Sequence, residues 1–256
     1  MFEMVKDFSD MPSVKWFGVT ILEPFTVLTN LMIAAACFYA YRTLKKKGLT
    51  VTKTQLYINY FFLLMGIATI IGGVIGHAFL YTTGLYGKIP GWYIGMAGVA
   101  LFERAAIDHG RPFMNKKTGQ FFSVVNYLEI LIFMTLSLIK LNFVFVILHC
   151  FYGLFIVVFC FETYVYLKTR NPSFKYVMMA TIFGFLAILS HAFQLSINEW
   201  FNYNDVSHLE MTVAIIFYYK AALHLQVYQG KEKNQIEDKN QSKDKNQSKE
   251  KKEYVT

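Results

Sequence analysis

The sequence predicts an all-α membrane protein of seven transmembrane helices, and three observations lead to this prediction. The 256-residue chain is 55% hydrophobic and only 16% charged, whereas about a quarter of the residues in a soluble domain carry charge. Its apolar residues form runs as long as a helix needs to cross a bilayer. Its basic residues gather between these runs, which is typical of membrane topology and not of a nucleic-acid-binding surface.

Seven stretches have the roughly 20 mostly apolar residues that one crossing requires. The fourth and fifth are separated only around Lys140, which leaves one broken hairpin as an alternative, but their combined length exceeds a single crossing. We therefore expect a transmembrane domain over residues 18–228 that follows a short outer segment of residues 1–17. The approximate limits of the stretches are 18–42, 56–82, 91–108, 121–140, 142–168, 174–197 and 206–228.

The basic residues predict the orientation of these helices, because loops rich in Lys and Arg stay in the cytosol. The loops after the first, third and fifth stretches are basic, whereas the other loops carry one lysine or none. We therefore expect the amino terminus outside and the carboxyl terminus in the cytosol. The basic loop residues are Arg42, Lys45, Lys46, Lys47, Lys53, Arg104, Arg111, Lys116, Lys117, Lys168, Arg170 and Lys175.

Residues 229–256 differ in composition from the rest of the chain, with many lysines and a repeated KNQSK segment. A segment with so little to bury is expected to be a disordered cytosolic tail. Contact of its lysines with anionic lipid is the alternative to a purely solubilising role.

Several ionisable side chains fall inside the predicted helices, where each one needs a partner or a function. On the predicted topology, His77 ends the second helix on the outer side, and Asp205 and His208 begin the seventh helix on that side. Glu23 and Asn30 lie seven residues apart on one face of the first helix. These positions predict a polar cavity that opens on the outer side.

Two further histidines, His149 and His191, are expected in the outer halves of the fifth and sixth helices. For each histidine taken alone, a structural role is the alternative to metal binding. Zinc takes three or four imidazole, carboxylate or thiolate ligands, and a catalytic zinc keeps one position for water. Asp205 and His208 share a helical face, and His77 would approach from the second helix. We expect zinc here, with Asp205 as a ligand or general base for hydrolysis.

These residues resemble the motifs of the alkaline ceramidase superfamily, which includes the ceramidases, the adiponectin receptor group and the Per1 lipid-remodelling proteins. Residues EPFTVLTN, from Glu23 to Asn30, look like the E-x6-N that begins the ceramidases' first helix. The segment GGVIGH places His77 where the family's S-x-x-x-H ends, and DVSHLEMT places His208 at the first histidine of H-x-x-x-H. The resemblance covers residues 18–228. It implies a zinc-dependent membrane hydrolase of the same seven-helix topology.

The sequence also departs from the family's pattern. Gly73 stands where the family has serine, Thr212 stands where it has the second histidine, and no aspartate follows His77 closely. The third zinc ligand would therefore have to be His191 or Asp205. Glu23 resembles a calcium ligand of the ceramidases, so the resemblance also implies calcium as a second ion.

Three functions remain open from the sequence. The first is a zinc-dependent hydrolase that acts on a lipid amide or ester. The second is a non-enzymatic receptor, scaffold or lipid-binding protein in which the site has decayed, and the third is a b-type haem protein with paired histidine ligands. Each predicts a multi-pass protein, of the cell membrane in a bacterium or of an endomembrane in a eukaryote, with membrane lipid as substrate or ligand and no nucleic-acid partner.

Overall fold

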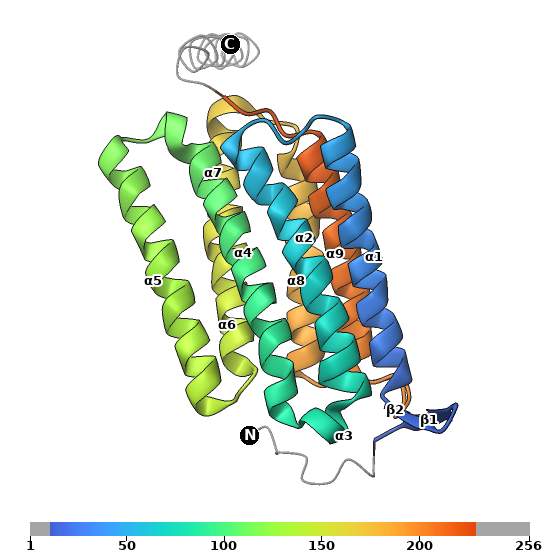
Figure 1. Cartoon of the computed structure of the whole chain (residues 1–256). Coiled ribbons are helices and arrows are strands. Elements are labelled where there is room, and N and C mark those ends of the chain that lie inside the picture. The colour runs from blue at the N-terminus through green and yellow to red at the C-terminus, as the bar shows by residue number, and fades with distance from the viewer. Residues whose placement is uncertain (1–10, 229–256) are drawn as a thin grey trace, which may run out of the picture.

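Long antiparallel helices make up the computed structural model, which describes residues 11–228 (Figure 1). The expected tail, residues 229–256, and residues 1–10 of the expected outer segment lie outside the described residues. The elements in chain order are β1 (Ser13–Trp16), β2 (Val19–Leu22), α1 (Pro24–Lys46), α2 (Lys53–Gly73), η1 (Val74–Ala78), α3 (Leu80–Thr83), η2 (Leu85–Lys88), α4 (Ile89–Gly110), η3 (Arg111–Phe113), α5 (Lys116–Lys140), α6 (Val144–Phe151), η4 (Tyr152–Val158), α7 (Phe159–Thr169), α8 (Phe174–Ala192) and α9 (Tyr203–Leu223).

Five helical stretches are long and apolar enough to cross a membrane: α1, α2 with η1, α5, α6 to α7, and α8. The outward face of α5 is strongly apolar, since Leu131 is 62% exposed and Ile139 is 68% exposed. Contiguous apolar surface of this kind is rare on soluble monomers. The chain is therefore an all-α membrane protein, as the sequence predicts, apart from one short β-hairpin.

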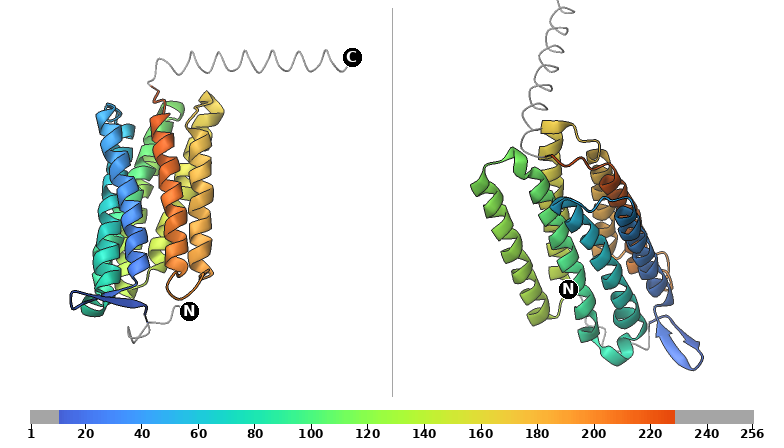
Figure 2. Two further views of the ribbon diagram at one scale, coloured as in Figure 1. Left: turned by 90° about the vertical axis from the view of Figure 1, so that its right-hand side faces the viewer. Right: turned by 45° about the horizontal axis from the view of Figure 1, so that its top comes forward.

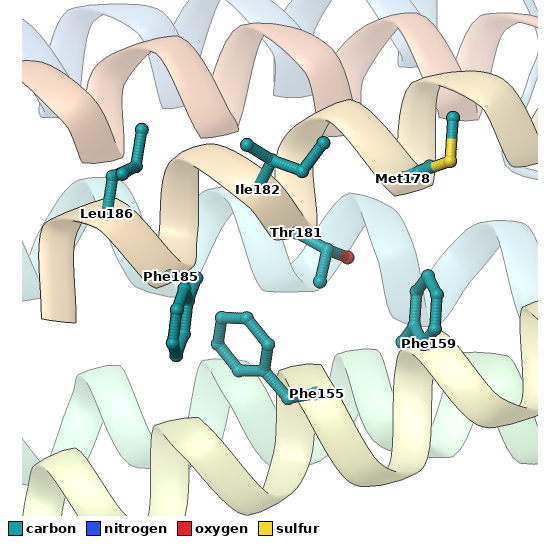
Figure 3. A pocket seen from close by; sticks show the side chains of 7 residues that line it. All are labelled: Phe155, Phe159, Met178, Thr181, Ile182, Phe185 and Leu186. Atoms are coloured by element: carbon teal, nitrogen blue, oxygen red, sulfur yellow. The ribbon is translucent and has the colours of Figure 1, made fainter. Parts of the chain in front are cut away.

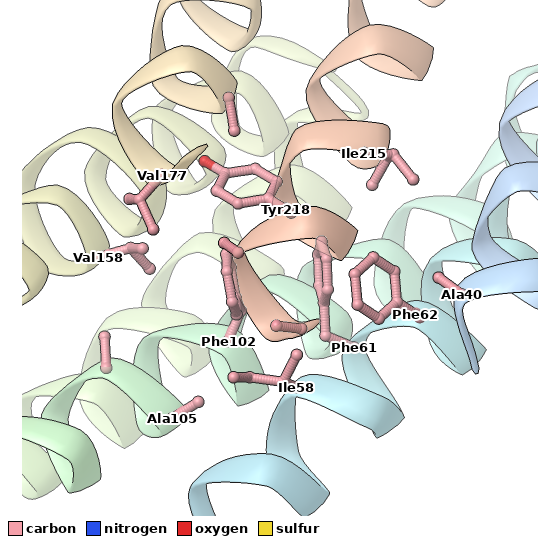
Figure 4. Close-up of a cluster of buried hydrophobic side chains, with 14 of the residues drawn as sticks. Ala40, Ile58, Phe61, Phe62, Phe102, Ala105, Val158, Val177, Ile215 and Tyr218 are labelled. Carbon is pink, nitrogen blue, oxygen red and sulfur yellow. The ribbon is translucent and has the colours of Figure 1, made fainter. Parts of the chain in front are cut away.

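The helices pack into a bundle around a core of aromatic and small side chains (Figure 4). The rings of Phe61 on α2 and Phe102 on α4 stack with centroids 4.6 Å apart, and Tyr218 on α9 meets Phe102 edge to face at 4.8 Å. Such aromatic pairs add stability beyond the area that they bury. Figure 2 shows α1, α9 and α8 side by side, with α2 behind α1.

One end of the bundle carries the β1–β2 hairpin together with α3 and η2, and we call it the hairpin end (Figure 1). The last described residues, which follow α9, lie at the opposite end of the bundle. The first helix begins at Pro24 and not at residue 18 as expected, because Val19 to Leu22 pair with β1 as a strand. Glu23 then turns the chain with a left-handed backbone (φ 44°), and proline suits the first helical turn.

Three further boundaries shape the hairpin end. The sixth helix, α8, ends at Ala192 instead of residue 197. The seventh, α9, begins at Tyr203 with a capping box between Asn202 and Asp205, which satisfies amide groups that a helix start leaves free. A π-helical turn, η1, ends the second helix and contains His77. Such insertions are frequent at functional sites.

Candidate metal centre

His77 and Glu23 form a close pair at the hairpin end. His77 Nδ1 lies 2.7 Å from Glu23 Oε2, and the other carboxylate oxygen accepts a hydrogen bond from Asn202 Nδ2 at 3.1 Å. Burial raises the pKa of Glu23, but His77, Lys88 and Asn202 together lower it by more, so that the pKa is about 2. Glu23 is therefore a carboxylate, which can only accept hydrogen bonds. His77 Nδ1 must donate, and the neutral imidazole then keeps a free lone pair on Nε2.

A second chain of contacts orients His208. Its Nδ1 lies 3.0 Å from Thr29 Oγ1, and this hydroxyl lies 3.3 Å from Asp205 Oδ1. The other oxygen of the fully buried Asp205 accepts from the backbone N–H of Asn202 at 2.8 Å. The Thr29 hydroxyl also lies 3.1 Å from Thr26 O and has one proton to donate to this carbonyl or to Asp205. With that proton directed to either oxygen, Thr29 accepts from His208 Nδ1. As in His77, the Nε2 of His208 is left with a free lone pair.

These two nitrogens are the ligand atoms that a metal would use. The Nε2 atoms of His77 and His208 make no hydrogen bond to any other residue of the described chain. A histidine whose Nδ1–H is held by a carboxylate or another protein acceptor is the usual form of a metal ligand, because the acceptor fixes the ring and its tautomer. The donor set at the hairpin end therefore fits a transition metal such as zinc.

The two rings lie at right angles with centroids 6.4 Å apart. Two imidazoles on one zinc ion have centroids about 5 Å apart, given Zn–N distances of about 2.1 Å and a tetrahedral angle. His191, near the end of α8, is close enough to interact electrostatically with both histidines. Its ring packs edge to face on Tyr203 at 5.1 Å. Coordination of one ion by all three would therefore require the rings to move inward.

Asp205 lies in this cluster, as the topology predicts, and hydrogen bonds hold its carboxylate in place. Both of its oxygens accept hydrogen bonds, and one of them belongs to the capping box of α9. This arrangement fixes the carboxylate of Asp205 between Thr29 and the start of α9. Glu23 is likewise held by one hydrogen bond to each of its oxygens.

The structure explains two of the departures from the ceramidase pattern. A side chain at Gly73 would place its Cβ 2.9 Å from Asn30 Cβ, so α1 and α2 approach too closely for serine. Asn30 itself donates to Thr26 O at 2.9 Å and lies 3.4 Å from His208 Nδ1. The hydroxyl of Thr212 donates to His208 O within α9, at 2.8 Å, and so belongs to the helix and not to the centre.

Three members of the cluster were not predicted from the sequence. Thr29 links Asp205 to His208, Asn202 donates to Glu23, and the ammonium group of Lys88 interacts with Glu23. Thr29 and Asn202 are uncharged and common in helices and caps, so only the fold identifies them. The sequence does single out Lys88, since it is the one basic residue between the second and third predicted helices.

His149 does not join this group. It lies on α6, and its side chain contacts Met96 on α4 and Glu129 on α5, the latter at 2.7 Å. Glu103, Glu129 and His149 form the one group in the described chain whose three ligand atoms all lie within 4.8 Å of one another. Carboxylates near the middle of predicted membrane helices were the signal for this second cluster.

A groove lies between η4, α7 and α8, away from both clusters (Figure 3). Its volume is about 280 Å³, and its walls are apolar apart from the hydroxyl of Thr181, which bonds within its own helix to Val177 O. Phe155 faces Phe185 across it, and Phe159 faces Met178. A groove with such walls suits an acyl chain better than a polar substrate.

Comparison with known proteins gives one match. The family described as "Family of unknown function (DUF6962)" matches residues 25–227, so the chain belongs to this family. No curated protein and no solved structure matches the chain.

Proposed function

We propose that this member of the DUF6962 family is a zinc-dependent integral membrane hydrolase that acts on a lipid amide or ester at its hairpin end. One observation carries the proposal. His77 and His208 are each held through Nδ1 by a buried acceptor, Glu23 for one and Thr29 for the other, while each Nε2 remains available. We assign zinc to these two histidines and His191. Bound zinc polarises a carbonyl group and acidifies water, which is the chemistry that hydrolysis needs.

The protein groups around these ligands have supporting roles. The ionised Glu23 makes the His77 imidazole a stronger ligand by accepting its Nδ1 proton. Asp205 and Thr29 do the same for His208 through the intervening hydroxyl. Lys88 adds a positive charge beside Glu23, which favours a carbonyl or phosphate oxygen of the substrate at this end of the bundle.

We also propose that seven helical stretches cross the membrane, so that α4 and α9 complete the five that are long and apolar enough by composition alone. Each of these two helices carries buried ionisable residues, Glu103 on α4 and Asp205 on α9. Such groups lower the mean hydropathy of a helix that faces protein on most sides. The basic loops lie at the end opposite the hairpin, which supports a cytosolic position for that end.

A non-enzymatic, lipid-binding protein of the same fold is the second candidate. It is favoured by Thr212, which stands where the ceramidases have their second histidine, and by the hydrogen bonds that already engage Asp205, because both leave fewer groups to activate water. Both proposals share membrane lipid as the partner. They differ in whether a lipid bond is cleaved.

Metal analysis and a lipid assay on the full-length protein test the proposal. We expect zinc bound at the hairpin end and hydrolysis of N-acyl sphingoid amides or glycerolipid esters in detergent micelles. His77→Ala should remove both, whereas His224→Ala should keep both, because His224 lies at the opposite end and stacks on Tyr176. Zinc content that is the same in His77→Ala and the unmodified protein would refute the site. Zinc binding without hydrolysis of any lipid would support the second candidate.

A further inference from the structure

A second polar cluster is enclosed between α4, α5 and α6. Glu103 and His149 are fully buried, and Glu129, at the middle of α5, is 8% exposed. One ligand atom from each of the three lies within 4.8 Å of the other two. Two of the carboxylate atoms, Glu103 Oε1 and Glu129 Oε2, are buried and have no hydrogen-bond partner in the described chain. Unpaired buried oxygens are costly, so they require a ligand or a proton.

The neighbouring residues hold these groups toward one another. His149 Nε2 lies 3.0 Å from Met96 O, so it carries a proton and donates it, while Nδ1 faces Glu129 Oε1 at 2.7 Å. Asn126 Nδ2 donates to Glu103 Oε2 at 3.2 Å and leaves Oε1 open. Gly153 makes room for this oxygen, because a Cβ there would lie 2.6 Å from it.

The charges of the three ligands match a divalent ion. With a divalent ion, two carboxylates and a neutral imidazole sum to zero charge. A neutral assembly is far cheaper to bury in a bilayer than a lone carboxylate.

We infer that Glu103, Glu129 and His149 form a structural binding site for a divalent first-row metal ion that ties α5 to α4 and α6. The ligands are Glu103 Oε1, Glu129 and His149 Nδ1, and Met96 O and Asn126 are the outer groups that orient them. Mixed imidazole and carboxylate donors suit Zn²⁺, Fe²⁺ or Mn²⁺. Ca²⁺ and Mg²⁺ prefer oxygen ligands alone. All three ligands are buried, which keeps an ion here out of reach of a substrate and favours a structural role.

The position of α5 supports this role. It lies at the edge of the bundle in Figure 1 and contacts α4 and α6, and most of its apolar face is exposed. Few buried apolar side chains therefore hold it in place. A metal ion shared with two neighbouring helices would supply this attachment.

The test uses the full-length chain with His77→Ala and His208→Ala together, so that the hairpin-end centre cannot contribute metal. After treatment with a chelator, this protein is equilibrated with Co²⁺, passed through a desalting column and analysed for bound metal and visible absorption. We expect about one Co²⁺ per chain. Glu103→Gln in this background should weaken binding about tenfold or more.

The matched control is Glu162→Gln in the same background. Glu162 is also buried and bonds to a histidine, with Oε1 2.9 Å from His109 Nδ1, but it belongs to no three-donor group in the described chain. It should retain Co²⁺. Absence of Co²⁺ from the parent protein, or unchanged binding by Glu103→Gln, would overturn the inference. If Glu103→Gln does not fold, X-ray absorption of the Co²⁺-loaded parent protein tests the site instead. Spectra that show no imidazole ligand on the Co²⁺ ion would refute it.

Discussion

Replacing Glu23 with glutamine tests the pair that orients His77. The pKa of Glu23 is about 2 instead of 4.5, and this difference corresponds to about 3 kcal/mol in favour of the ionised carboxylate in the folded protein. Glutamine has the same shape but no charge. We therefore expect Glu23→Gln to lower the free energy of unfolding at pH 7 by about 1–3 kcal/mol and to weaken zinc binding by about 10–100-fold.

The same pair predicts a dependence on pH. A lowered pKa in the folded state means that the stabilisation is complete above about pH 4.5 and is lost as the pH falls toward 2. At pH 3 the unmodified protein should have lost about 2 kcal/mol of the roughly 3 kcal/mol from this source. Glu23→Gln should lack this part of the acid sensitivity, because glutamine does not titrate.

Reversible unfolding by SDS in mixed micelles, at pH 7 and pH 3, measures both effects. Glu199→Gln is the control, because Glu199 is exposed and lies in the loop between α8 and α9, which belongs to the hairpin end. It should change neither stability nor acid sensitivity. The reasoning is refuted if Glu23→Gln unfolds with the same pH dependence as the unmodified protein and binds zinc equally well.

Two further substitutions test the packing and the second chain of contacts. Gly73→Ser should lower the free energy of unfolding by about 1–3 kcal/mol, because the new Cβ would lie 2.9 Å from Asn30 Cβ. Gly72→Ala is the control, since its Cβ would lie 3.8 Å from the nearest atom. It should lower the free energy of unfolding by less than half as much in the same assay. Thr29→Val removes the buried hydroxyl between the aspartate and the histidine of α9, and we expect a loss of about 1–3 kcal/mol together with weaker zinc binding. Thr135→Val, at an exposed position on α5, should leave zinc binding unchanged, and equal zinc affinity in both threonine variants would contradict the assigned role of Thr29.

The class of the protein could be predicted from the sequence, because hydropathy and loop charge are local properties. The start of the first helix could not. The segment before Glu23 is as apolar as the helix itself, and its pairing as a strand depends on the turn at Phe17 and Gly18, both of which have positive φ. A hydropathy profile does not distinguish an apolar strand from the first turns of a helix.

The candidate centre could be predicted only in outline. Topology places Glu23, His77 and His208 at one level, but which atoms meet depends on how each helix is rotated about its axis. The π-helical turn at η1 changes that rotation for His77, and no pattern in the sequence predicts this turn. His149 was expected at the same level for the same reason, yet its side chain faces Glu129 across a different helix interface.

Three glutamate–histidine pairs join neighbouring elements among the described residues. The exposure of the histidine side chain distinguishes the pair with a proposed chemical role from the two with a structural role. The pairs Glu162–His109 and Glu129–His149 have histidine side chains that are 0% exposed, whereas the His77 side chain in the third pair is 14% exposed. A buried pair in an apolar bundle is costly to break, and so it fixes which helices pack together. A histidine that is oriented by a carboxylate and still reachable can also bind an ion or substrate that enters from outside. The chemistry is therefore assigned to the hairpin end, and the two closed pairs are assigned to the architecture that supports it.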